Sequence, residues 1–330
     1  MKSHQKCILC GSDNIVPHWN NARGYNVSKC LDCSFLFLNE IINDQELEDY
    51  YSQNYFMASY AKDEKKLIDA AKNPKIISEA KEYASLIKFY QPNAHNVGEI
   101  GCSWGYLLYN LQSFGYSAKG FELSKTTAEV GSKQLGIKII PGFFEAQDKQ
   151  FDVLILRHVL EHVPNPQDLL EKIYASINKD GLFILEGPNL DSISSRLFGK
   201  NVSWVSPPDH ISFPNFRALI MACEKLGFTC IYQNSRRGRG ISIFHQALLN
   251  TIGLIFGGKE RAKVNLGGIN EKAPSKGLSS LKNAALKTVN FLDLLSSPIH
   301  PFLKQALLEE EMLIIFKKKY DNLSNYSDKE

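Results

Sequence analysis

The stretch VGEIGCSWGYLLY, residues 97–109, decides the fold of this 330-residue chain. An apolar approach ending in Ile100 meets two glycines, Gly101 and Gly105, and an amphipathic run follows them. This order predicts a strand, a tight turn and the first turn of a helix. The N-terminus of such a helix offers unpaired backbone N–H groups to an anionic or polar ligand, and glycines let a ligand approach the backbone closely. We therefore expect a ligand-binding turn at this point.

Composition limits the class of protein. The chain is 44% apolar and 22% charged, with a formal net charge of +3. These values suit a packed core in roughly two domains, or in one large domain with appendages. So balanced a charge argues against a dedicated nucleic-acid binder. The polar N-terminus has no apolar signal region, and no apolar run reaches transmembrane length, so we expect a cytoplasmic protein with no transmembrane segment.

Four of the seven cysteines form two closely spaced pairs near the N-terminus. Cys7-x-x-Cys10 and Cys30-x-x-Cys33 are separated by nineteen residues. Two such pairs supply four thiolates to a tetrahedral Zn²⁺, and four sulfur ligands leave no open position, which indicates a structural site. The alternatives are four unrelated buried cysteines or a redox pair. A module of about forty residues buries little apolar surface, so metal binding should supply much of its folding energy.

Strands and helices alternate after residue 96. The second strand, Ser117–Phe121, ends in Glu122, which lies 21 residues after Gly101. A carboxylate at this point can accept hydrogen bonds from ribose hydroxyls, and proteins that bind S-adenosylmethionine (SAM) or NAD share the feature. The third strand leads into a loop whose Phe143 and Phe144 could hold an adenine, although core packing explains both phenylalanines equally well.

Residues 151–166, FDVLILRHVLEHVPNP, combine an apolar central strand with a polar turn. They resemble the segment FD-x-x-x-x-x-x-VLEH-x-x-x-P of small-molecule class I SAM-dependent methyltransferases, which include the ubiquinone-biosynthesis O-methyltransferases and the broad methyltransferase 23 group. The spacing Glu-x-Gly-x-x-x-Gly at 99–105 resembles motif I of that class. Residues 208–215, PDHISFPN, with the helix that follows them, resemble a later segment of the same group. The resemblance covers roughly residues 96–235.

This resemblance implies an α/β fold, a Rossmann-like doubly wound methyltransferase sheet of seven strands that binds SAM at the carboxyl ends of its strands. The residues that it implies in SAM binding follow the first four strands of the sheet: Glu99, Gly101, Cys102, Gly105, Tyr106, Glu122, Leu123, Phe143, Phe144, Arg157 and His158. The four-cysteine module resembles the zinc-binding domain of deoxysugar C-methyltransferases, which act on nucleotide-linked sugars. Those proteins usually carry a further C-terminal domain, and we expect this chain to be too short for a full one, so the resemblance implies a sugar or glycan acceptor more strongly than C-methylation.

Methyl transfer to a hydroxyl or an enolate needs a base, and histidine is the usual base near neutral pH. We predict that His210 is this base, because it follows the fifth strand, where the methyl group is expected. A lid histidine bonded to the backbone is the alternative. His158 is a second catalytic candidate. With Glu161 and His162 it has i, i+3 and i+4 spacing, which predicts one shared helix face. Ubiquinone O-methyltransferases can hold a divalent cation there, but with an acid at the first position.

The chain is expected to divide into six parts. They are a zinc-ribbon-like module (1–40), a helical linker or lid (41–95), the SAM-binding core (96–247), a helical insertion before the last strand (248–309), the final strand (310–319) and a disordered tail (320–330). The final strand is expected to pair antiparallel at the sheet edge. The amphipathic insertion could form a lid, a homodimer contact or a membrane-surface element. A basic turn at 236–240 could meet a phosphate, although solvated charge is the default.

Taken together, these features predict a SAM-dependent methyltransferase with a structural zinc site. Its acceptor is expected to be a small molecule, most simply a sugar or a glycan or nucleotide-sugar precursor. An RNA methyltransferase whose zinc ribbon grips nucleic acid is the first alternative. The four cations of residues 1–40 make a thin phosphate-binding surface, so no nucleic-acid partner is expected. A SAM-binding protein without catalytic activity is the second alternative.

Overall fold

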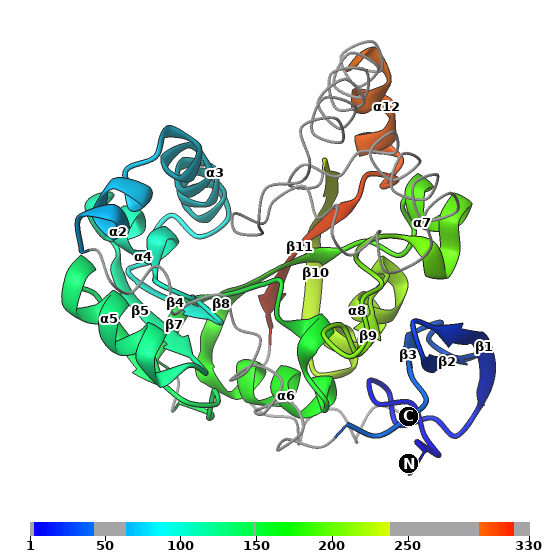
Figure 1. Ribbon diagram of the computed structural model, residues 1–330. Coiled ribbons are helices and arrows are strands. Elements are labelled where there is room, and N and C mark those ends of the chain that lie inside the picture. The colour runs from blue at the N-terminus through cyan, green and yellow to red at the C-terminus, as the bar shows by residue number, and fades with distance from the viewer. Residues whose placement is uncertain (1–2, 43–63, 148–149, 238–296, 320–330) are drawn as a thin grey trace, which may run out of the picture.

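The computed structural model describes residues 3–42, 64–147, 150–237 and 297–319 (Figure 1). Its main element is a seven-stranded sheet with the spatial order β10-β11-β8-β7-β4-β5-β6. The strands are β4 (Asn96–Ile100), β5 (Ser117–Glu122), β6 (Lys138–Pro141), β7 (Phe151–Arg157), β8 (Ile177–Pro188), β10 (Phe228–Arg236) and β11 (Glu311–Lys318). The predicted α/β class with a seven-stranded doubly wound sheet is confirmed.

Strand β11 does not lie at the edge of the sheet, where it was predicted. It pairs antiparallel with both β10 and β8, so it lies inside the sheet and not at the edge. The expectation of an edge strand was wrong, and burial explains why. Seven of its eight residues are buried, because helices cover both faces of the sheet at this position. The other six strands run in one direction, with β4, β5, β6, β7 and β8 joined by parallel pairing.

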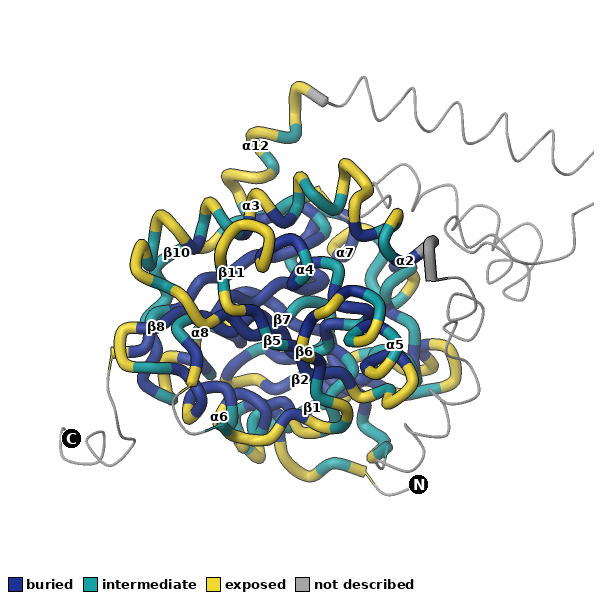
Figure 2. The backbone as a smooth tube through the Cα atoms, turned by 90° about the vertical axis from the view of Figure 1, so that its left-hand side faces the viewer, coloured by how far each residue is buried: buried dark blue, intermediate teal, exposed yellow. Residues whose placement is uncertain are grey.

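Two apolar layers pack on the two faces of the sheet. The side chains of β11 alternate between them: Leu313 and Ile315 join the layer under α3 (Pro74–Tyr90) and α4 (Tyr106–Ser113). Met312, Ile314 and Phe316 join the layer under α6 (Pro166–Ser176) and α8 (Phe216–Lys225). Figure 2 shows the buried strands inside and the exposed turns of the helices outside. This period of two follows from the alternation of side chains along a strand.

The remaining described helices frame the two ends of the sheet. Helix α5 (Lys125–Leu135) begins at Ser124, whose side chain accepts a hydrogen bond from the Thr127 backbone N–H. The others are α2 (Glu64–Ala71), α7 (Ile193–Phe198) and α12 (His300–Gln305). Among the residues described, no helix is both long and apolar enough to cross a membrane.

The N-terminal residues form a second, four-stranded sheet with the order β1-β2-β3-β9. Strands β1 (Ile15–Ala22), β2 (Tyr25–Cys30) and β3 (Leu36–Leu38) form an antiparallel meander. The fourth strand, β9 (Ser212–Phe213), comes from the core. The cysteine module is therefore paired with the core through backbone hydrogen bonds.

Several sequence-based expectations fall outside the described residues. They include the aromatic part of the proposed lid at 43–63, most of the proposed insertion and its dimer contact at 238–296, and the tail at 320–330. Within the predicted helical linker or lid at 41–95, the structure shows α2, in which Leu67 and Ala71 are buried, and α3.

Gly131 of α5 lies against the turn between β4 and α4, and a substitution there tests this packing. A Cβ at Gly131 would lie 2.6 Å from the Trp104 carbonyl oxygen. We expect Gly131→Ala to lower the free energy of unfolding by about 1–2 kcal/mol, because the backbone clash outweighs the helix-propensity gain of about 1 kcal/mol. Urea denaturation measures the change. Glu129→Ala on the exposed side of α5 is the control and should stay within about 0.5 kcal/mol of the wild type. Equal stability of both variants would contradict the packing.

Candidate methyltransferase site

The turn between β4 and α4 requires glycine at two positions. Gly101 and Gly105 have φ angles of +68° and +83°, in the left-handed region that favours glycine. A Cβ at Gly101 would lie 2.3 Å from Val159 Cγ2, and one at Gly105 would lie 2.1 Å from Ile137 Cδ1. The turn is therefore held close to β6 on one side and to the segment after β7 on the other.

Glu122, at the carboxyl end of β5, stabilises the same turn through hydrogen bonds. One of its carboxylate oxygens accepts a hydrogen bond from the Ser103 N–H, and the other accepts one from the Ser124 N–H, each at 2.9 Å. The side chain is 7% exposed, and burial raises its pKa. Glu122 thus lies beside the helix N-terminus of α4, at the edge where parallel α/β sheets bind their ligands.

The residues implied in SAM binding differ in what they offer to a ligand. Cys102 points its thiol into the core, because a Cβ at Gly120 would lie 2.4 Å from its sulfur. Phe144 is buried against Phe121, with ring centroids 4.8 Å apart, whereas Phe143 is 63% exposed. Leu123 is 41% exposed beside Glu122. Of the two phenylalanines, Phe143 has the freer ring.

Arg157, the last residue of β7, lies in a buried ionic network. Its Nε donates to Glu99 Oε1 at 3.0 Å and its Nη1 donates to Glu79 Oε1 at 2.9 Å. The guanidinium lies 5.4 Å from the centroid of the Tyr83 ring. Burial works against the charged form, but Glu99 and the other surrounding anionic groups outweigh it and raise the pKa of Arg157. Arg157 and Glu99 thus hold each other in place at the ends of β7 and β4.

His158 follows β7 in a strained conformation, with a φ of +51°. Its Nδ1 lies 3.5 Å from Glu161 Oε1, and its Nε2 lies 3.5 Å from Glu186 Oε1 and 3.7 Å from Glu311 Oε1. Burial alone would lower the pKa of His158, but Glu161 and Glu186 outweigh it and raise the pKa to about 10. His158 is therefore an imidazolium at neutral pH.

The predicted helix face of His158, Glu161 and His162 was wrong. His158 precedes a short 3₁₀ helix, Leu160–His162, and does not belong to it. As a result its side chain faces β8 and β11, whereas His162 faces Asp209 and donates a 2.8 Å hydrogen bond from Nδ1 to the Asp209 carbonyl. The left-handed backbone at residue 158, which periodicity cannot show, separates the two histidines.

The His210 side chain lies close to the side chains of His162 and Glu161. The His162 and His210 rings are 4.6 Å apart in an edge-to-face arrangement. Within the described part of the chain, the Nδ1 atom of His210 is buried without a hydrogen-bond partner, as are both carboxylate oxygens of Glu161. Burial and the neighbouring His162 lower the pKa of His210 to about 4. The imidazole is therefore neutral at pH 7.

Several residues that shape this site were not singled out from the sequence. Glu186 near the end of β8 accepts a hydrogen bond from the buried Tyr83 hydroxyl and a 2.9 Å hydrogen bond from Arg236. Glu311 contacts His158, and Asp209 contacts His162. Asp209 lay inside the recognised segment 208–215, but no role was assigned to it. A carboxylate at the carboxyl end of a parallel strand was the signal that could have found Glu186.

Arg236 does not form the predicted basic turn. It is the last residue of β10, where it pairs with Glu186 at 2.9 Å and with Glu82 at 3.0 Å. Its charge is therefore neutralised by carboxylates and is not presented to a phosphate. The rest of the turn, residues 238–240, lies outside the described residues.

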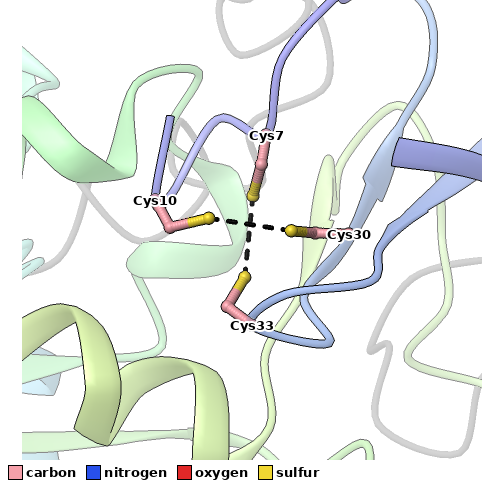
Figure 3. Close-up of side chains that lie close together, drawn as sticks. All are labelled: Cys7, Cys10, Cys30 and Cys33. Atoms are coloured by element: carbon pink, nitrogen blue, oxygen red, sulfur yellow. Dashed lines mark hydrogen bonds between the residues drawn. The ribbon is translucent and has the colours of Figure 1, made fainter. Parts of the chain in front are cut away.

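The four cysteines converge as the sequence predicts for a metal site. Figure 3 shows the four sulfur atoms pointing toward one another. Cys7 and Cys33 sulfurs are 3.7 Å apart, and Cys10 and Cys30 sulfurs are 3.6 Å apart. A tetrahedral Zn²⁺ with bonds of about 2.3 Å needs sulfurs about 3.8 Å apart, so the set fits this ion. Without an ion the four thiols share their protons unevenly: the hydrogen bond with Cys33 lowers the pKa of Cys7, whereas the same bond raises the pKa of Cys33 and burial raises that of Cys10.

Two further groups in the described part of the chain bring possible ligand atoms within 4.8 Å of one another. One is Glu161 with His162 and His210, and the other is His158 with Glu186 and Glu311. In the second group a protonated His158 already balances carboxylate charge. The grouping of imidazoles with carboxylates suits proton transfer as well as metal binding.

The glycine turn, the strand order and the carboxylate after β5 define a class I SAM-dependent methyltransferase. Residues 71–233 match the family model described as a methyltransferase domain. A SAM dependent methyltransferase from Archaeoglobus fulgidus is similar in structure, with a TM-score of 0.43 and 16% identity over 72% of this chain and 94% of that one.

Relatives with assigned names are distant. The chain is 27% identical to a tRNA U34 carboxymethyltransferase of Campylobacter jejuni subsp. jejuni over 145 residues, which cover 40% of this chain and 48% of that protein. It is 27% identical to a protein of the same name from Campylobacter jejuni subsp. doylei over 205 residues, which cover 54% of this chain and 69% of that one. The chain thus spans about half the length of the first of these relatives.

The His158 proton should make the protein's stability depend on pH. Because the folded pKa of about 10 exceeds the ordinary 6.5, the stabilisation is complete below about pH 6.5 and is lost as pH rises through 10. We expect wild-type protein to lose roughly 2 kcal/mol more unfolding free energy than His158→Gln between pH 7 and pH 10.5, after allowance for solvent screening. Urea denaturation at the two pH values measures this. Parallel losses in both proteins would show that the proton of His158 is not responsible.

Proposed function

We propose that this protein transfers the methyl group of SAM to a hydroxyl of a small molecule, most simply a sugar or a glycan or nucleotide-sugar precursor. The observation that carries the proposal is the neutral, buried His210, whose Nδ1 has no hydrogen-bond partner among the described residues. Its segment is hydrogen-bonded to the turn after β7 through the Ile211 N–H and the Glu161 carbonyl, and ligands of parallel α/β sheets bind at the carboxyl ends of the strands.

The cofactor site is proposed to lie between β4, β5 and β7. Backbone N–H groups of the turn at Gly101–Gly105 would receive the polar end of SAM, and Glu122 would accept hydrogen bonds from the ribose hydroxyls. The exposed ring of Phe143 would cover the adenine. When bound, SAM supplies an electrophilic methyl carbon and leaves as the neutral thioether S-adenosylhomocysteine.

The proposed role of His210 is general base catalysis. Its Nε2 lies 3.9 Å from Asp209 Oδ2, which favours a proton on Nε2 and a lone pair on Nδ1. As the acceptor oxygen forms its bond to the methyl carbon, the hydroxyl proton moves to Nδ1 of His210. The protonated ring would then be balanced by Glu161 and Asp209, whose charges act on His210 in the folded protein. His158 is proposed to hold Glu161 and Glu186 in place.

The charge around the site supports a small acceptor more than a polyanion. Carboxylates of Glu161, Glu186 and Glu311 lie around His158, and the nearby Arg157 and Arg236 are each paired with carboxylates. RNA phosphates would meet this negative field at a cost. A neutral hydroxyl of a sugar would not.

A tRNA acceptor is the second candidate, because distant relatives are named tRNA U34 carboxymethyltransferases. The two acceptors can be separated by methyl transfer from labelled SAM. Salt-sensitive binding and labelling of total tRNA, with no labelling of nucleotide-sugars, would favour RNA. Labelled nucleotide-sugar would favour the small-molecule acceptor.

The four-cysteine site is proposed to hold a structural Zn²⁺. Four sulfur ligands leave no position for a substrate, so the ion would contribute to folding and not to the reaction.

Calorimetric titration with S-adenosylhomocysteine tests the cofactor site. We expect micromolar binding to the wild type and at least about tenfold weaker binding to Glu122→Ala, because the variant loses the ribose acceptor and the anchor of Ser103. Lys125→Ala, an exposed change at the start of α5, is the control and should bind as the wild type does. Absence of binding to the wild type would contradict the cofactor assignment.

Substitution of His210 tests the base. We expect His210→Ala to lower kcat for methyl transfer by about 10²–10³-fold while binding of S-adenosylhomocysteine is retained, since general bases contribute about 10²–10⁴-fold. Single-turnover transfer from labelled SAM measures the rate. Unchanged transfer would exclude His210 as the base. Cofactor binding without transfer to any acceptor, by wild type and variant alike, would favour a SAM-binding protein without activity.

A further inference from the structure

The segment that carries Asp209 and His210 lies between two parts of the fold. On one side, β9 pairs antiparallel with β3, with Leu36 opposite Phe213. The hydrogen bond from the Leu38 N–H to the Ile211 carbonyl, at 2.9 Å, extends this pairing. On the other side, the Ile211 N–H donates to the Glu161 carbonyl at 2.8 Å. The backbone next to His210 is thus hydrogen-bonded both to the N-terminal sheet and to the turn that carries Glu161.

Side chains of the N-terminal module brace the same segment from its other end. Arg23 donates to the carbonyls of Val202 and Ser203 at 3.4 and 3.2 Å. Lys200 donates to the Asn20 carbonyl at 2.7 Å. An apolar cluster joins β1–β3 to Val202, Val205 and Ile211, and Trp204 packs against it. Residues 199–213 are therefore enclosed by the N-terminal module over most of their length.

The cysteine pair Cys30 and Cys33 lies in the loop that leads into β3. The Cys30 N–H donates to the Phe35 carbonyl at 2.9 Å, and the Ser34 N–H donates to the Cys30 carbonyl at 3.0 Å. The Ser34 carbonyl in turn accepts a 2.9 Å hydrogen bond from the side chain of Asn215, which also caps α8. A short series of hydrogen bonds thus links the cysteine site to the residues at both ends of β9.

We propose that the four-cysteine module is a positioning element for acceptor activation: through β3 and Arg23 it holds the Asp209–His210 segment in place, so that an ordered cysteine site is required for methyl transfer but not for cofactor binding. The close approaches that require glycine at Gly101 and Gly105 are made to Val159 and Ile137, which belong to the core. The proposal rests on the proposed role of His210 as the base.

Positioning of this kind has a signature that a purely structural role lacks. The low pKa of His210 depends on its burial, on His162 and Glu161 from the 3₁₀ turn, on Asp209 beside it and on His158 after β7. Loosening of the segment would admit water, raise the pKa of His210 toward its ordinary value and move the acid limb of the kcat profile to higher pH.

Substitution of Arg23 tests the proposal without disturbing the cysteines. We expect Arg23→Ala to lower kcat by about tenfold and to shift the acid limb of its pH profile upward, since small misplacements at a reacting group are costly. Binding of S-adenosylhomocysteine should stay within about twofold of the wild type. Arg23→Lys, which keeps one donor, should recover part of the rate. An unchanged kcat and pH profile in Arg23→Ala would overturn the proposal.

Removal of metal from the full-length protein supplies a second readout. The protein is stripped with a chelator, and hydrogen exchange of the amides of residues 209–213 and binding of S-adenosylhomocysteine are measured before and after Zn²⁺ is returned. We expect at least about tenfold faster exchange without metal, reversal on its return, and retained cofactor binding. Unchanged exchange would overturn the proposal. So would loss of cofactor binding together with exchange over the whole chain, because the module would then support the entire fold.

The two proposals can fail separately. Fast exchange at residues 209–213 on metal removal would support positioning of the segment by the module. Full methyl transfer by His210→Ala in the same study would reject His210 as the base. A strong loss of methyl transfer in His210→Ala would support His210 as the base. If metal removal then left exchange at residues 209–213 unchanged and Arg23→Ala left kcat unchanged, the module's role would be rejected.

Discussion

The buried carboxylate of Glu186 is the constraint on which the site depends. It lies within β8, is 2% exposed and accepts hydrogen bonds from Tyr83 and Arg236, while His158 faces it at 3.5 Å. Removing a charge from water is expensive unless partners replace the lost solvent, so the groups around Glu186 must stay in place together. These partners come from α3, β10 and the end of β7. The Glu186 carboxylate thus links α3 to β10 and to the segment after β7 that carries Glu161.

The two histidines near Glu161 show how this network separates chemical roles. His158 is surrounded by carboxylates and keeps its proton, whereas burial and the neighbouring His162 favour the neutral form of His210. Histidines with opposite protonation at one pH are what an acid–base site needs, because one can hold fixed charge while the other accepts a proton. The left-handed backbone at residue 158 turns His158 away from His162, the histidine that packs against His210.

Sequence patterns were sufficient for the sheet, the glycine turn and the convergence of four cysteines, because each depends on local spacing. The β7 strand and Gly101–Gly105 turn were predicted from apolar periodicity and from backbone requirements. The pairing of β3 with β9 was not, since it joins Leu36 to Phe213 across the whole core and leaves no local signal. The place of β11 between β10 and β8 was missed for the same reason. The ionic partners of Arg157 and Arg236 are likewise set by tertiary contacts, so the sequence indicated solvated charge or a phosphate contact at Arg236 and not its carboxylate partners.

The account is tested most directly by an NMR titration of the imidazole nitrogens in ¹⁵N-histidine-labelled protein, with His158→Gln and His210→Gln used to assign the signals. We predict that His210 stays neutral down to about pH 4, while His158 stays protonated up to about pH 10. Titration of both rings near 6.5 would show that neither is held by the buried network, and would contradict the division of roles on which the proposed mechanism rests.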